Sequence, residues 1–254
     1  MTDRVLLREI PNSFSQALSM RAPSSPIDVW VARQQHVAYR SVFTAAGYQE
    51  TLVPADEDCP DCVFVEDTAV IVDGIALITR PGALSRQPET GPVGRALAPY
   101  LDLVHMQAPA TLDGGDVMCA GSKIYVGRSA RTNAEGIATL AHTFGRDRVV
   151  PIDLPCGVLH LKCVVSPLSP GEILVADETL SHELFAGLEI IRAPLGESYA
   201  ANVVALGEYV IVAEEYPRTI AALDAAGHSL WPVPTSEVCK ADGSLTCQSL
   251  RWSY

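Results

Sequence analysis

One pattern recurs along the chain and limits what it can fold into: two short apolar runs, a helical stretch and a further apolar run. In the clearest copy, residues 62–80 predict two strands around the turn-forming pair Asp73-Gly74, which is a strong hairpin signal. A helix over 91–101 and an extended segment over 102–109 follow. Strands that alternate with helices predict the α/β class.

The same order is predicted in the rest of the chain, with one copy split between the two ends. In the third unit, Asn133 or Thr132 can cap the helix and Gly145 can end it. The N-terminal part lacks a first strand, which the C-terminal segment 244–252 could supply by pairing the chain ends. In the third unit the predicted strand pair is 111–129, the helix 131–145 and the last strand 148–155. In the fourth unit the two strands are 159–168 and 172–180, the helix is 181–188 and the last strand 189–194. In the fifth unit the two strands are 199–206 and 208–215, the helix is 217–227 and the last strand 228–234. The N-terminal strand, helix and strand are 5–10, 27–47 and 49–54.

Corresponding positions of the units are spaced almost regularly. Steps of 47 residues join positions 66, 113 and 160, a step of 40 leads to position 200, and a further 47 lead to position 247. Five units in 254 residues average about 51 residues each, which is typical of repeat architectures. We therefore predict a closed ring of five units around a central opening. The residues expected to meet at that opening are Glu66, Asp67, Asp113, His160 and Cys247.

Composition excludes several classes of function. The chain has 18 Lys and Arg against 30 Asp and Glu, a formal charge of −12, and 48% of its residues are apolar. This length and hydrophobicity can bury a substantial core in one large domain or two small ones. The negative charge, with no Lys/Arg cluster to offset it, argues against a nucleic-acid partner and favours a small cationic one.

The chain shows no sign of a membrane span or of secretion. No apolar run reaches the roughly 18 residues of a span, and the N-terminus lacks the features of a signal peptide. Seven cysteines, an odd number scattered along a chain that needs no cross-links, are interpreted as reduced thiols. We therefore expect a soluble intracellular protein of the cytoplasm. Cys59-Pro60-Asp61-Cys62 lacks the further ligands of a zinc site and the βαβ context of a thioredoxin-like motif, so we expect no metal there.

One cysteine, one histidine and several carboxylates at equivalent repeat positions favour a nucleophilic site. A thiol with an ordinary pKa of about 8.5 becomes a good nucleophile when a nearby cation stabilises its thiolate. A histidine transfers protons near neutral pH, and an aspartate can hold its ring in orientation. Structural alternatives stay open for each residue alone: Cys247 as a buried thiol, His160 as a core histidine, and Asp-Gly-Gly-Asp at 113–116 as a turn.

Seven segments resemble the dimethylarginine dimethylaminohydrolases, a family of guanidino-modifying enzymes, in order and at matching spacing. Between about Val5 and Leu250 these are PDCVFVED at 60–67, ALITRPGALSR at 76–86, ATLDGGDV at 110–117, VGRSARTN at 126–133, LHLK at 159–162, YAAN at 199–202 and DGSLTCQS at 242–249. The resemblance implies the five-bladed α/β propeller called the pentein fold, with pseudo-fivefold ββαβ units around a central channel. It also implies a single catalytic domain over residues 1–254.

The resemblance further implies a role for each matching residue. Cys247 matches the nucleophile, His160 the acid/base and Asp113 the residue that orients the histidine. Some bacterial relatives and the arginine deiminases have Glu in place of Asp113, so we expect the backbone to compensate for the missing methylene. The residues expected around the substrate are Glu66 and Asp67 at the guanidinium, Arg86 and Arg131 at the carboxylate, Asp61 as a further substrate-contacting acid, and Leu18 with the Ala241 carbonyl near the amino end. On the residues alone, either arginine could instead form a surface ion pair.

The expected reaction converts monomethylated or asymmetrically dimethylated arginine to citrulline, with release of methylamine or dimethylamine, through an S-alkylthiouronium on Cys247. No metal or organic cofactor is expected, because the guanidinium already carries the electrophile's charge. The resemblance also implies a place in arginine metabolism and the nitric oxide pathway, and leaves a homodimer open. Two alternatives stay open: an arginine deiminase or other guanidino hydrolase, disfavoured because the chain has no room for an extra helical domain, and a non-catalytic pentein binding protein, disfavoured by the Cys/His pair.

Overall fold

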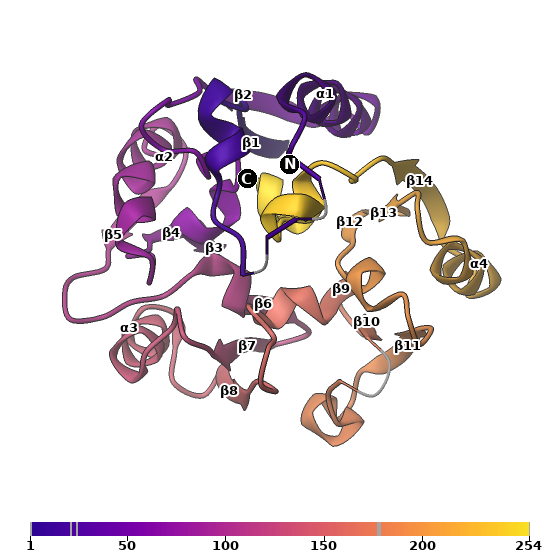
Figure 1. Ribbon diagram of the computed structural model, residues 1–254. Helices are drawn as coiled ribbons and strands as arrows, with labels where there is room; N and C mark the ends of the chain where they lie inside the picture. The colour runs from indigo at the N-terminus through magenta and orange to yellow at the C-terminus, as the bar shows by residue number, and fades with distance from the viewer. Residues whose placement is uncertain (1, 21, 24, 177–178, 254) are drawn as a thin grey trace.

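In the computed structural model, which describes residues 2–20, 22–23, 25–176 and 179–253, the strands form five sheets of three strands each. The sheets are arranged like blades around a common axis, and the α-helices lie on the outside of the ring (Figure 1). This arrangement confirms the predicted ring of five α/β units. Within those described ranges, no helix is both long and apolar enough to span a bilayer.

Every blade has the same connection. Its inner strand pairs antiparallel with the middle strand, and the chain then crosses on the outside and returns parallel to the middle strand. Three of these blades use an α-helix for the crossing. The first consists of β3 (Ala69–Val72), β4 (Ile75–Ile78), α2 (Thr90–Leu97) and β5 (Asp102–His105), and the second of β6 (Val117–Ala120), β7 (Lys123–Arg128), α3 (Ala134–Phe144) and β8 (Val149–Asp153). The third consists of β12 (Val204–Leu206), β13 (Tyr209–Ala213), α4 (Pro217–Ala225) and β14 (Ser229–Val233). A fourth blade consists of β9 (Val165–Ser169), β10 (Glu172–Ala176) and β11 (Glu189–Ala193).

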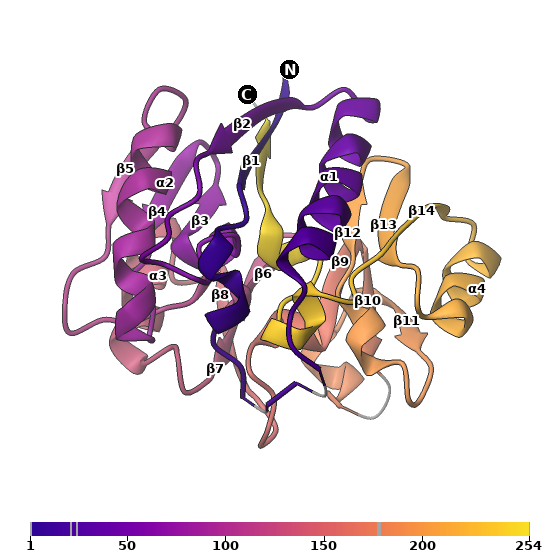
Figure 2. The ribbon, with the colours of Figure 1, turned by 45° about the horizontal axis from the view of Figure 1, so that its top comes forward.

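The remaining blade is built from both ends of the chain. Its strands are β15 (Leu250–Ser253), β1 (Asp3–Arg8) and β2 (Gln49–Val53), with the helix α1 (Val29–Ala45) between β1 and β2. The antiparallel register of β1 and β15 runs from Asp3 opposite Ser253 to Leu6 opposite Leu250. Figure 2 shows the two ends side by side at the edge of the ring. The predicted closure of the structure by its chain ends is therefore confirmed.

The inner strands begin later than the sequence predicted. The first part of each predicted strand is a short 3-10 turn: η2 (Val65–Thr68), η4 (Gly114–Asp116), η5 (Leu161–Cys163), η7 (Ser198–Ala201) and η9 (Thr246–Gln248). The helix predicted over 181–188 was also too long, because only the 3-10 helix η6 (His182–Phe185) forms there. Residues 177–178 of the strand predicted over 172–180 lie outside the described residues.

The core is shared between blades rather than enclosed in each. One apolar cluster joins Val5 and Leu7 of β1 and Phe43 of α1 to Val204 and Ile211 of the neighbouring blade. Burial of such apolar surface is the main force that holds blades together, at roughly 25 cal/mol per Å². In the same region the Tyr39 hydroxyl donates to the carbonyl oxygen of Leu245 at 2.7 Å and lies 2.8 Å from the Ser249 hydroxyl. These bonds fix the turn η9 against α1.

The helix α3 begins and ends as its sequence predicts. The Asn133 side-chain oxygen accepts hydrogen bonds from the amides of Gly136 at 2.8 Å and Thr111 at 2.9 Å. Gly145 ends the helix with φ of 103°, a backbone conformation that favours glycine. Asn133 thus caps its own helix and also holds the segment that leads to η4.

We expect Asn133→Ala to lower the free energy of unfolding by about 1–2 kcal/mol, because the variant loses the cap and the bond to Thr111. Urea unfolding followed by circular dichroism measures this change. Asn133→Asp is the matched control, since it keeps an oxygen that accepts both bonds and should lose less. Equal losses in the two variants would contradict the capping role.

Candidate active site

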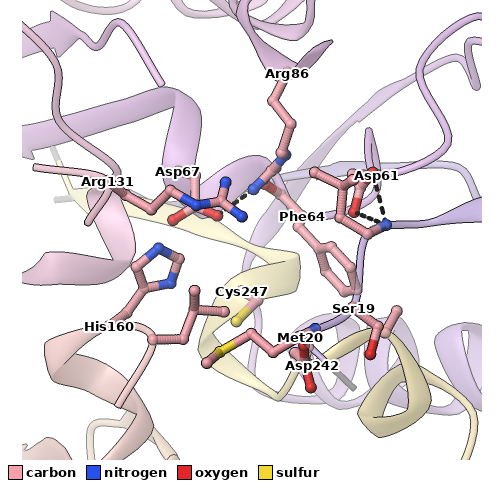
Figure 3. A pocket seen from close by; sticks show the side chains of 14 residues that line it. Ser19, Met20, Asp61, Phe64, Asp67, Arg86, Arg131, His160, Asp242 and Cys247 are labelled. Carbon is pink, nitrogen blue, oxygen red and sulfur yellow. Dashed lines mark hydrogen bonds and ion pairs between the residues drawn. The ribbon is translucent and has the colours of Figure 1, made fainter. Parts of the chain in front are cut away.

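A cavity of about 160 Å³ is lined by residues from several blades (Figure 3). It lies where the chain enters the inner strands, at the position that the repeat spacing predicted. In Figure 3 the Cys247 thiol lies between the His160 ring and the Phe64 ring. The lining residues are Leu18, Ser19, Met20, Asp61, Phe64, Asp67, Arg86, Arg131, Leu159, His160, Ala241, Asp242, Gly243 and Cys247.

The 3-10 turns bring these residues together. The turn η2 contacts η4 and η9, η4 contacts η5, and η5 contacts η7. This close packing depends on glycine: a Cβ at Gly114 would lie 2.0 Å from the carbonyl oxygen of Glu66, and a Cβ at Gly115 would lie 2.7 Å from His160 Nδ1. The Gly-Gly pair in the segment 113–116 is therefore required by the approach of neighbouring turns, beyond the ordinary turn preference of glycine.

Asp113 lies behind His160 and does not line the cavity. Its Oδ2 atom is 3.0 Å from His160 Nε2, so the aspartate side chain is long enough to reach the ring. The amide of Gly82 donates to Asp113 Oδ1 at 2.8 Å, and the Thr132 hydroxyl accepts from the Asp113 amide at 3.2 Å. Because both side chains are buried and Asp113 is held at both ends, the orientation of the His160 ring is fixed.

Asp67 is the buried carboxylate of the cavity. It accepts from the Gly115 amide at 2.8 Å through Oδ1, and from Arg86 Nη1 through Oδ2. Burial opposes its charge, but the neighbouring cations of His160 and Arg86 outweigh this effect and lower the pKa of Asp67 to about 2. Asp67 is therefore ionised at neutral pH and presents a negative charge to the cavity.

The neighbouring acid, Glu66, lies elsewhere than the sequence suggested. It accepts from Lys162 Nζ at 2.6 Å and from the Thr246 hydroxyl at 2.7 Å, and it lines an adjoining cavity of about 260 Å³ with Lys162. Thr246 is the residue before Cys247 and is held in turn by Asn202, whose Oδ1 accepts from the Thr246 amide at 2.8 Å. Glu66 thus anchors the turn that carries Cys247 and does not line the cavity beside Asp67.

The two predicted arginines differ in their surroundings. Arg86 is almost fully buried and is paired with Asp67 and, at 2.8 Å, with Glu89. Arg131 has 23% of its side chain exposed, and its Nη1 atom lies 3.8 Å from Asp113 Oδ2. Both line the cavity, but Arg131 is the more accessible of the two guanidinium groups.

The opposite wall is formed by loop residues. Both oxygens of Asp61 accept from the Leu18 amide, at 3.1 and 3.2 Å, and burial raises the pKa of Asp61. The Met20 amide donates to Asp242, beside Ala241. Cys59 and Cys62, which flank Asp61, are buried free thiols. The segment 59–62 therefore contributes an acid to the cavity, and its thiols pack inside the protein.

Several residues that line the cavity were not predicted from the sequence. Leu159, Asp242, Gly243 and Phe64 fall inside the quoted segments, so a reading of whole motifs could have included them. Ser19 and Met20 follow Leu18 in a loop without a motif. One group within the described ranges has spacing suited to a metal ion, since the ligand atoms of Asp67, Asp113 and His160 lie within 4.8 Å of one another. Asp67 and Asp113 are already paired with Arg86 and His160, which favours an ion-pair network.

Cys247 and His160 both hold their protons tightly. Burial raises the pKa of the Cys247 thiol well above its ordinary value, and the carboxylates of Glu66 and Asp67 raise it further. Burial opposes a charged imidazole at His160, but the Asp67 carboxylate and the hydrogen bond to Asp113 outweigh it and raise the pKa of His160 to about 9. At neutral pH the site therefore contains a neutral thiol beside an imidazolium.

Comparison with known proteins was made with both sequence and structure. No protein-family model matches the chain. The N(G),N(G)-dimethylarginine dimethylaminohydrolase of Pseudomonas aeruginosa is 37% identical over 99% of this chain and 100% of that protein. The protein of the same name from Streptomyces coelicolor is 36% identical over 98% of this chain and 96% of that protein.

Solved structures show the same likeness. A cysteine-to-serine mutant of the Pseudomonas aeruginosa enzyme, complexed with citrulline, has a TM-score of 0.93 at 35% identity over 99% of this chain and 100% of that chain. The N-terminal domain of a cyanobacterial arginine dihydrolase has a TM-score of 0.87 at 18% identity over 99% of this chain and 97% of that chain, which shows a shared fold.

Fold and likeness together place the chain among the pentein-fold hydrolases that act on guanidino groups. The two bacterial relatives are more than 30% identical to this chain, and each match covers nearly the full length of both proteins. This likeness identifies one family within the class. The chain belongs to the dimethylarginine dimethylaminohydrolase family.

We expect a histidine NMR titration to separate two of the six histidines widely. His160 should lose its proton near pH 9, whereas His36, whose pKa is lowered to about 3 by burial and by Arg40, should stay neutral above pH 5. Because His160 binds its proton more tightly in the folded chain than at the ordinary pKa of 6.5, its protonation stabilises the fold fully below pH 6.5, and this contribution is lost as the pH rises through 9.

Asp67→Asn should lower the pKa of His160, because the Asp67 carboxylate contributes most to raising that pKa. The pKa of His36 should stay unchanged, because Asp67 is not among the groups that shift it. An unchanged His160 titration in this variant would contradict the charge balance described for the site.

Proposed function

We propose that the chain hydrolyses N-omega-methylated arginines, asymmetric dimethylarginine and monomethylarginine, to citrulline and dimethylamine or methylamine. The observation that carries this proposal is the convergence of a half-buried thiol, an imidazolium and an ionised carboxylate on one cavity, in Cys247, His160 and Asp67. Membership of the family and the citrulline complex of the similar Pseudomonas aeruginosa enzyme support it.

The substrate fits the cavity as a cation at one end and an amino acid at the other. Its guanidinium would meet the Asp67 carboxylate, near Cys247. Arg131 would bind the α-carboxylate with its accessible planar fork, with Arg86 beside it. At the amino end, Asp61 is already held by the Leu18 amide and can accept from an ammonium group next to the Ala241 carbonyl. Glu66 would act indirectly, through Thr246, on the turn of Cys247.

The order of events follows from the charges. The pKa of Cys247 is high because burial and the nearby charges of Glu66 and Asp67 oppose a thiolate, and a bound guanidinium cation offsets those charges, so the thiol can lose its proton to solvent. The thiolate attacks the central guanidinium carbon and forms a tetrahedral species. His160, held by Asp113 and protonated at neutral pH, gives its proton to the departing amine as the carbon–nitrogen bond breaks.

The second half of the reaction uses the same residues. An S-alkylthiouronium remains on Cys247, and His160 is now neutral. It takes one proton from water as the water oxygen attacks the thiouronium carbon. The carbon–sulfur bond then breaks, the remaining hydroxyl proton passes to the departing Cys247 thiolate, and citrulline leaves. The imidazolium is restored at the end of the cycle. The chain's own residues thus supply the nucleophile, the acid and the base, and the proposal includes no cofactor.

The wider setting of this activity is also part of the proposal. Residues 1–254 would act as one catalytic domain, since both ends of the chain share one blade and residues from four of the five blades line the site. All seven cysteines are free thiols, which fits a reducing compartment such as the cytoplasm. The formation of citrulline supports a place in arginine metabolism, while the link to nitric oxide and a homodimer stay predictions.

Turnover of a substrate panel with citrulline detection tests the function. We expect asymmetric dimethylarginine and monomethylarginine to be turned over faster than arginine, and Cys247→Ser to abolish citrulline formation. Cys156→Ser, at an exposed thiol, is the matched control and should retain wild-type rates. Faster turnover of plain arginine would favour an arginine deiminase, and inactivity toward all guanidino compounds would favour a binding protein.

Gly115→Ala should reduce citrulline formation by about a hundredfold, because the added methyl would lie 2.7 Å from His160 Nδ1 and 2.8 Å from Asp67 Oδ1 and push both groups away. Gly171→Ala is the matched control, since nothing lies within 4 Å of its Cβ position and its rate should not change. Wild-type activity in the Gly115 variant would show that the close packing of the turns is not needed for catalysis.

A further inference from the structure

Glu89 is a buried acid that lies outside every segment of the family resemblance, which ends at Arg86 in this region. It closes the 3-10 helix η3 (Leu84–Glu89), one helical turn after Arg86, so the two side chains lie one above the other. Their exposed fractions are 1% for Glu89 and 5% for Arg86. Arg86 lines the cavity, while Glu89 lies behind it.

Most N–H groups of the Arg86 guanidinium already donate to oxygen atoms of the protein, so few remain for a ligand. Nε donates to both oxygens of Glu89, at 3.2 and 3.1 Å, and Nη2 donates to Glu89 Oε2 at 2.8 Å and to the carbonyl oxygen of Phe64 at 2.8 Å. Nη1 donates to Asp67. A guanidinium has five N–H groups, so one N–H of Nη1 stays available for a substrate.

The charges of this group matter as much as its bonds. Arg86 lies between two carboxylates, so the three ionised groups carry a formal net charge of −1. Without the charge of Glu89, Arg86 and Asp67 would form a neutral ion pair, and an entering guanidinium would gain little from approaching it.

We propose that Glu89 is a positioning residue that holds Arg86 and cancels its charge, so that the ion-paired Asp67 still attracts the substrate guanidinium. This inference rests on the proposed function. The inference also gives the two arginines different roles. Arg131 is the main ligand of the α-carboxylate, and Arg86 contributes one N–H.

Glu89→Gln tests the charge, because it keeps the shape of the side chain. The probe is agmatine, which has the guanidinium and an amine but no carboxylate, and its Kd is measured by calorimetry at pH 8.5. Burial raises the pKa of Glu89 to about 7, so its carboxylate is ionised in this assay. We expect the agmatine Kd to rise about tenfold. The KM for asymmetric dimethylarginine should rise by a smaller factor, because the charge of Arg86 is then no longer cancelled by Glu89 and attracts the α-carboxylate of the substrate more strongly. The kcat should stay within about threefold of the wild-type value.

Two further variants separate charge from structure. Glu89→Asp keeps the charge and should keep the agmatine Kd within about threefold of wild type. Glu197→Gln removes another buried acid, which lies away from the cavity and accepts from Arg218 Nε at 3.0 Å, and it should leave Kd, KM and kcat unchanged. Thermal melts establish that each variant is folded.

Three results would overturn the inference: an unchanged agmatine Kd in Glu89→Gln, a loss confined to the carboxylate-bearing substrate, or a tenfold loss in Glu89→Asp as well. Failure of the proposed function shows separately, as absent citrulline formation by the wild-type chain, because agmatine binding is measured without turnover.

Discussion

The pairing of β1 with β15 is the constraint on which the other blades depend. It joins the two ends of the chain in one sheet, and the remaining blades have to fit between them in a closed circle. Closure sets the distance between neighbouring inner strands and presses the 3-10 turns against one another, to the point where Gly114 has no space for a Cβ. The catalytic geometry is therefore a consequence of how the ring closes, because residues from four different blades reach one cavity.

Asp67 is central to the electrostatics of the site, as the pairing of β1 with β15 is to the fold. Its carboxylate holds the proton on His160, opposes loss of the proton from Cys247 and pairs with Arg86. Buried charges of this kind are stable only when each has a partner, and the two cations that face Asp67 come from other segments of the chain than Asp67 itself. In the proposed reaction, a further cation would shift the protonation of the thiol.

Local signals in the sequence predicted much of the fold. The hairpin at Asp73-Gly74, the cap at Asn133 and the helix end at Gly145 depend on neighbouring residues in the chain, and the structure has them as predicted. The 3-10 turns were predicted as the first part of the inner strands, and a turn was left open only for Asp-Gly-Gly-Asp at 113–116, where η4 forms. Each of these turns packs against turns of neighbouring blades, and such contacts are not visible in local sequence. The regular spacing predicted five residues at the central opening, of which Asp67, His160 and Cys247 line the cavity, whereas Glu66 and Asp113 do not.

Pairings between distant segments could not be predicted in the same way. Glu66 and Asp67 are adjacent in the sequence, yet the tight turn directs one toward Lys162 and the other toward Arg86. The bond between Glu66 and Lys162 spans 96 positions, and nothing in either local sequence indicates it. Such partners follow from the closed ring, which a single sequence indicates only through its repeat.

The high pKa of Cys247 has a consequence for the life of the protein between turnovers. Oxidants and alkylating agents react with thiolates, so a thiol that keeps its proton is a poor target for them. The exposed thiols of Cys119 and Cys156 are more accessible to such agents. The carboxylates that raise the pKa of the Cys247 thiol thus also lower its reactivity toward such agents, and under the proposed mechanism the reactive sulfur would form only while a substrate is there to consume it.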